Sequence, residues 1–116
     1  NTPLAALVLL NDPTFIEAAR VLGQRTLRDG GATDDERLSY AFRLATSRSP
    51  DADETAALES LLQRERTAFR ANAEAAESLI KIGLAPAPAD IPRFELAAWT
   101  SVGRAILNLS ETFTRE

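Results

Sequence analysis

Apolar side chains return every three or four residues along most of this chain, and proline or glycine interrupts each run. Leu38, Phe42 and Ala45, for example, stand at i, i+4 and i+7. This period places apolar residues on one face of an α-helix, whereas a strand would alternate with period two. β-branched residues are few, and 45% of the chain is hydrophobic. The sequence therefore predicts an all-α fold, a compact bundle of five or six helices.

Capping residues mark where the predicted helices begin and end. A short helix starts at Thr2-Pro3 and runs to about Leu10, and a second runs from Asp12-Pro13 to Gly30-Gly31. A third helix is capped at Asp34 and ends near Arg48, and an Asp51/Glu54 capping box starts a fourth. A linker over residues 84–90 leads to a last helix, which begins near Pro92. The apolar stripe of this last helix consists of Trp99, Val102, Ile106, Leu109 and Phe113.

The stripe of the fourth helix changes phase near Asn72. We interpret Asn72 as a second cap, which starts a separate helix that closes at Gly83. A single helix from Ala52 to Ile82 is the alternative. We expect Trp99 to be a central core residue, Gly103 to let another helix approach closely, and the hairpin over residues 38–62 to pack alongside.

Composition limits the chemistry of this chain more than any motif does. Among its 116 residues there is no His, Cys or Met. The usual general base and most zinc, haem and iron–sulfur ligands are therefore missing. Without Met we expect a cut piece, a single helical domain over residues 1–116 at the C-terminal end of a larger protein. A net charge of −4 with both signs interspersed predicts no nucleic-acid partner, and an apolar stretch of at most seven residues predicts no membrane span.

Two clusters of acidic residues are the candidates for carboxylate chemistry. They are Asp34, Asp35 and Glu36, and Asp51, Asp53 and Glu54. Both stand at predicted helix N-termini, where carboxylates stabilise the exposed N–H groups, so capping is the better explanation. A calcium loop starting at Asp51 would need glycine at its sixth position, and Ala56 stands there. We assign no catalytic, cofactor-binding or metal-binding residue.

The first predicted helix is apolar nearly all round, so it must be buried on all sides or cover another surface. Our candidate partner surface comprises Leu4, Leu7, Leu9, Leu10 and Phe113.

Three segments carry a family resemblance. They are residues 1–15 (NTPLAALVLLNDPTF), 41–50 (AFRLATSRSP) and 98–113 (AWTSVGRAILNLSETF). In this order the chain resembles, over its whole length, the planctomycete-specific C-terminal domain of unknown function. The resemblance implies the last part of a large exported protein, hence a periplasmic or secreted location. It also implies that a haem-binding cytochrome c-like domain sometimes accompanies it; the Cys-x-x-Cys-His attachment of such a domain is absent here, so this segment has no cofactor of its own.

These observations favour a non-catalytic helical module that packs against other domains of the same polypeptide. An accessory part of an enzyme, possibly directed at polysaccharide, is the alternative, and a partly buried acid pair lining a cleft would favour it. A module that binds glycans or small molecules would need exposed aromatic side chains, but most aromatics here fall on predicted core stripes.

Overall fold

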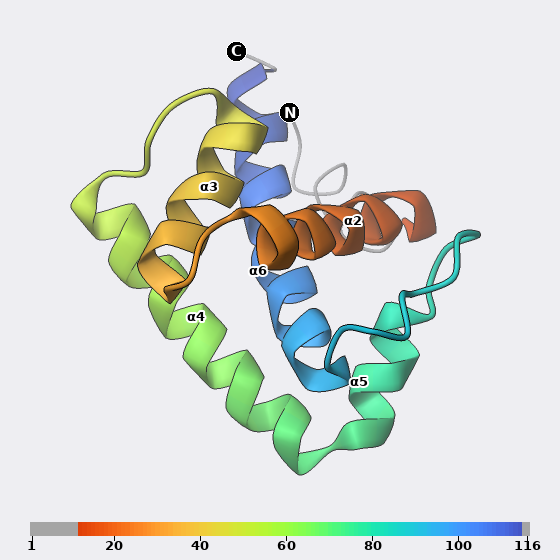
Figure 1. Ribbon diagram of the computed structural model, residues 1–116. Helices are drawn as coiled ribbons and strands as arrows, with labels where there is room; N and C mark the ends of the chain where they lie inside the picture. Colours follow the sequence, from red (N-terminus) through yellow and green to blue (C-terminus); the bar gives the residue numbers. More distant parts are fainter. Residues whose placement is uncertain (1–11, 115–116) are drawn as a thin grey trace.

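The computed structural model describes residues 12–114 of the chain, and the side chains of residues 12–110. Within this range helices are the only regular secondary structure and no strand occurs, as the periodicity predicts. The helices are α2 (Pro13–Asp29), α3 (Asp34–Thr46), α4 (Ala52–Ala71), α5 (Ala73–Ile80) and α6 (Arg93–Thr114) (Figure 1). The predicted helix over residues 2–10 lies outside the described residues.

Helix α6 is the axis of the bundle, and each of the other four helices contacts it (Figure 1). Trp99, in the second turn of α6, is 1% exposed, so the expected central position of this side chain in the core is confirmed. Helix α2 crosses α6 at Gly103, where an added Cβ would lie 2.6 Å from the Ala19 carbonyl oxygen. Glycine therefore permits the close approach that the sequence predicts at this position.

The buried residues form two clusters along this axis. The larger one joins α2, α3 and α4 to the middle of α6 through residues such as Leu38, Phe42 and Leu62. The smaller one packs α5 against the start of α6 and includes Ile80 and Leu96. The α3–α4 hairpin thus lies alongside α6, as predicted.

Among the described residues, the helix starts predicted at Asp12, Asp51, Asn72 and near Pro92 are confirmed, and the start predicted at Asp34 is wrong. The Asp12 carboxylate accepts from Thr14 N–H at 2.8 Å, and Asp51 forms the predicted capping box with Glu54. Helix α3 is capped by Thr33 instead of Asp34. Thr33 is the cap because Glu36 stands three residues after it. The Glu36 carboxylate accepts from the Thr33 N–H, and the Thr33 hydroxyl oxygen accepts from the Glu36 N–H, which completes a second capping box.

Asn72 separates two helices, so the single helix from Ala52 to Ile82 is wrong. The Asn72 side chain accepts a hydrogen bond from Ala75 N–H. The backbone N–H of Asn72 donates to the Phe69 carbonyl oxygen in the last turn of α4. Two ends differ slightly from the prediction. Helix α3 stops at Thr46 because Ser47 has a left-handed φ of 65°, and α5 stops at Ile80 before Gly83, whose φ is 106°.

A buried arginine joins the C-terminal end of α5 to α2. Arg20 is 1% exposed, and its guanidinium donates to the Ile80 carbonyl oxygen at 2.9 Å and to Gln24. One turn earlier, the Glu17 carboxylate accepts from the N–H groups of Leu84 and Ala85. The bond to Ile80 satisfies a carbonyl oxygen at the C-terminal end of α5, and the two bonds of Glu17 hold the loop that follows against α2.

Candidate functional site

An open groove of about 570 Å³ runs between α4 and the C-terminal half of α6. Helix α4 contributes one wall, with Ala57, Leu58 and Leu61. Helix α6 contributes the other wall, with Ala105 and Leu109. These are apolar side chains, and among them only Leu58 is fully buried. The groove therefore offers apolar surface that the described part of the chain leaves uncovered.

The α4 wall follows from a pattern that is visible in the sequence. Asp53, Ala57, Leu61 and Arg64 stand at i, i+4, i+8 and i+11. This spacing puts them on one helical face beside the Leu58/Leu62 stripe that enters the core. Sequence reasoning missed this face because its two apolar members extend the core stripe without forming a separate one.

The groove has an acidic end and a basic end. Asp53 and Glu54 stand at the first turn of α4, and Arg64 lies about 16 Å further along the helix, at 1.5 Å per residue. Glu54 is already engaged: Arg48 bonds it through two oxygens, at 2.9 and 2.8 Å, and the Asp51 N–H adds a third bond. Arg48 and the Asp51 N–H lower the pKa of Glu54 from 4.5 to about 2.

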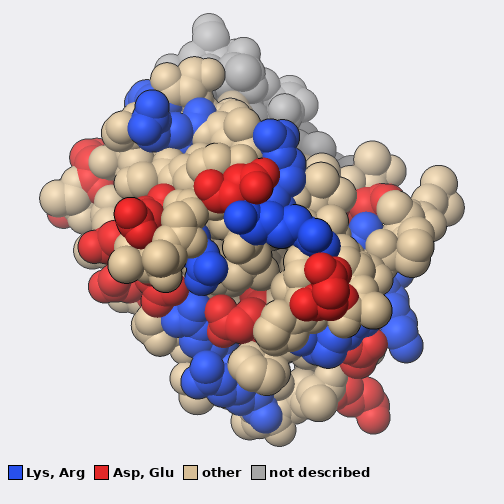
Figure 2. All heavy atoms as spheres, in the orientation of Figure 1, with Lys and Arg blue, Asp and Glu red and all other residues tan. Residues whose placement is uncertain are grey.

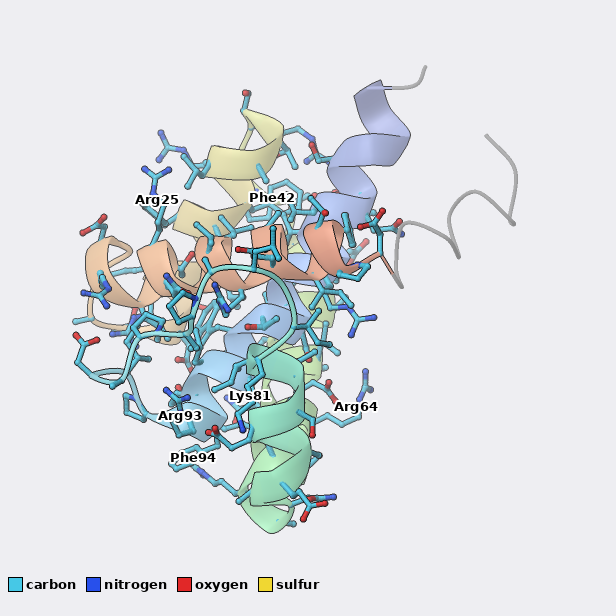
Figure 3. All side chains as sticks on the ribbon, turned by 90° about the vertical axis from the view of Figure 1, so that its right-hand side faces the viewer. Arg25, Phe42, Arg64, Lys81, Arg93 and Phe94 are labelled. Carbon is cyan, nitrogen blue, oxygen red and sulfur yellow. The ribbon has the colours of Figure 1, made fainter. Side chains whose placement is uncertain are left out.

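The other two charges of the groove remain available. No hydrogen bond or ion pair joins the side chain of Asp53 or Arg64 to another described residue. In Figure 3 the Arg64 side chain extends away from the bundle. An occupant of the groove would therefore meet an unpaired carboxylate near one end and an unpaired guanidinium near the other.

The candidate partner surface predicted from the sequence lies mostly outside the described residues. Leu4, Leu7, Leu9 and Leu10 precede residue 12, and the side chain of Phe113 is not described. The backbone of α6 continues to Thr114, so position 113 falls one helical turn beyond Leu109 of the groove.

A partly buried acid pair exists, but an arginine neutralises it. Arg66 on α4 bonds Asp34 of α3 at 3.0 and 3.1 Å and Glu95 of α6 at 2.6 and 2.9 Å. The Arg66 side chain is 13% exposed, and its hydrogen bonds lower the pKa of Asp34. Sequence reasoning assigned Asp34 to capping and missed this junction, because its members are about 30 residues apart and share no local pattern.

The pKa values of three further carboxyl groups are also lowered. Backbone N–H groups lower the pKa of Glu17 and Glu36, and Arg93 lowers that of Glu77. Figure 2 shows that basic and acidic side chains interleave on one face of the molecule. In the described range these carboxylates are held ionised, as stabilising groups are; a general acid would need a raised pKa.

Residues 12–114 contain neither a membrane-spanning helix nor an acidic metal-binding cluster. None of the helices there is long and apolar enough to span a bilayer. The same residues contain no group of three or more acidic side chains arranged to hold a metal ion.

Comparison with known proteins identifies a family for this chain. No curated protein and no solved structure matches the chain. A family model described as PSD1, protein of unknown function (DUF1553), matches residues 1–62. The matched part contains the segments 1–15 and 41–50 and all of α2 and α3, and it ends within α4. Because the match covers more than half of the 116 residues, the chain belongs to the PSD1 (DUF1553) family.

Proposed function

We propose that this chain is a non-catalytic helical module that packs against other parts of a larger, exported protein. The observation that carries the proposal is the apolar groove between α4 and α6. Its walls, Ala57 and Leu61 on one side and Ala105 and Leu109 on the other, are only partly covered within the described chain. Apolar surface of this kind, rimmed by charges, is typical of a protein–protein contact.

The docking surface extends beyond the groove in this proposal. Phe113 belongs to this surface in the proposal, because position 113 lies one turn beyond Leu109 on α6. The apolar residues Leu4, Leu7, Leu9 and Leu10 contribute a second part of the same interface. Any haem of the larger protein is carried by another domain, because this chain has neither Cys nor His.

The state of the acidic residues supports a module over an accessory part of an enzyme. The best candidate for a catalytic pair, Asp34 with Glu95, is tied to Arg66 by four hydrogen bonds. Its lowered Asp34 pKa is the opposite of what proton donation at neutral pH requires. The pair joins three helices, which is a structural task.

Hydrogen exchange tests the proposal. We expect amides of residues 57–64 and 105–109 to exchange more slowly when this chain is part of the larger protein than when it is isolated. Leu61→Asp should remove that added protection, while the exchange of α2 and the helical circular dichroism stay unchanged. Equal protection of the groove helices in both contexts would refute docking at this site.

A further inference from the structure

Resting on the proposed docking function, we infer that the occupant of the α4/α6 groove is an amphipathic helix that lies antiparallel to α4. The shape of the groove, the size of its side chains and the charges at its two ends support this occupant.

The shape fits a helix. Both walls are helices, and the lining on α4 extends from Asp53 to Arg64, about three helical turns. Small and large residues alternate along these walls: Ala57 precedes Leu61 on α4, and Ala105 precedes Leu109 on α6. Each alanine leaves a hole of the kind that a leucine or isoleucine of a third helix fills in ridges-into-grooves packing. Helix-in-groove binding uses such anchors at i, i+3/i+4 and i+7.

The charges set the direction of the helix. Asp53 lies at the end of the groove where α4 begins, and Arg64 lies about 16 Å further along α4. Helices favour acidic residues in their first turn and basic residues in their last turn. An antiparallel helix places its basic last turn beside Asp53 and its acidic first turn beside Arg64. A parallel helix would bring like charges together at both ends.

Glu54 does not weaken this argument. Its carboxylate is bound by Arg48 and by the Asp51 N–H, so it is already compensated. Asp53, by contrast, has no partner among the described side chains. The unpaired carboxylate at this end is therefore the one that can recognise a cation of the occupant.

Two synthetic peptides of about 14 residues test the direction with the unmodified chain. Both carry leucines at i, i+4, i+7 and i+11. One has two Glu in its first turn and two Lys in its last turn, and the other has these ends exchanged. We expect the first peptide to shift the amide resonances of residues 53–64 and 105–109, and to bind at least about tenfold more tightly at low salt. Equal affinities, or shifts outside the groove, would overturn the inference.

A charge exchange in the protein provides the second arm. Asp53→Lys combined with Arg64→Glu should invert the preference between the peptides. The matched control is Asp35→Lys with Arg43→Glu on α3, which also exchanges a first-turn acid with an exposed arginine and lies outside the groove. It should leave the preference unchanged. Self-association of the chain, with concentration-dependent shifts at Leu61, would also overturn the inference, because a second copy would then fill the groove.

The two hypotheses fail differently. If the groove amides become protected from exchange in the larger protein but the groove binds both peptides equally, the docking function stands and the antiparallel helix is refuted. If the groove stays unprotected in the larger protein, the docking function itself is refuted.

Discussion

Glycine at two positions sets the distance between the two central helices. Gly103 of α6 lies against the backbone of Ala19, and Gly23 of α2 lies against the backbone of Trp99. The four residues form two pairs spaced four apart, so they share one contact line along each helix. At Gly103 an added Cβ would stand 2.6 Å from a carbonyl oxygen, whereas at Gly23 the nearest atom would be 3.2 Å away.

We therefore expect Gly103→Ala to destabilise the protein by roughly 1–3 kcal/mol, although alanine is the better helix former by about 1 kcal/mol. The clash involves backbone atoms, which cannot rotate away as a side chain can. Gly23→Ala is the graded control and should cost less, because a shift of a few tenths of an ångström relieves it. Urea unfolding of both variants measures the difference, and a more stable Gly103→Ala protein would contradict the close contact.

At the scale of the helix, caps explain why most boundaries were predictable and why one was not. A cap is a contact within three or four residues, so the pairs Asp12/Pro13 and Asp51/Glu54 can be recognised without knowledge of the fold. Thr33 and Asp34 are adjacent, and both can cap a helix. The position of Glu36 decides between them, since it is three residues beyond Thr33. Asp34 is then free to bond Arg66.

Carboxylates that accept hydrogen bonds in the folded chain predict how stability depends on pH. Folding lowers the pKa of several acids, most clearly that of Glu54, from 4.5 to about 2. Between these two values the unfolded chain binds more protons than the folded one, so stability falls as the pH drops from about 4.5 towards 2. Thermal unfolding at pH 7, 4, 3 and 2 should show this decline. Glu54→Gln should make the decline shallower; stability that rises between pH 4 and pH 3 would contradict the assignment.

At the scale of the whole molecule, the contacts between distant helices were not predictable from the sequence. The periodic stripes indicate which face of each helix is buried, but they do not say which helix covers it. The bonds of Arg66 to Asp34 and Glu95, and of Arg20 to Ile80, depend on the final packing. The α4/α6 groove also depends on the final packing. It lies between two helices, and the apolar stripe of neither helix alone predicts the space between them.

Arg66→Ala should destabilise the protein by roughly 1–3 kcal/mol. It leaves two carboxylates without their partner, which costs 3–5 kcal/mol at a fully buried site, but the Asp34 side chain is 31% exposed and water replaces part of the loss. Arg64→Ala, two residues earlier on the exposed face of α4, should change the stability by less than about 0.5 kcal/mol. Denaturant unfolding followed by circular dichroism compares the two. Equal effects would mean that the junction of three helices contributes nothing.

The position of Trp99 gives the protein a built-in optical reporter. It is the sole tryptophan of the chain, and its indole is sealed beside the crossing of α2 and α6, where Nε1 has no hydrogen-bond partner in the described range. An indole in such dry surroundings emits at shorter wavelength than one in water. Its emission maximum therefore shifts to longer wavelength when the two central helices separate and water reaches the indole. Unfolding can thus be followed without a dye or label.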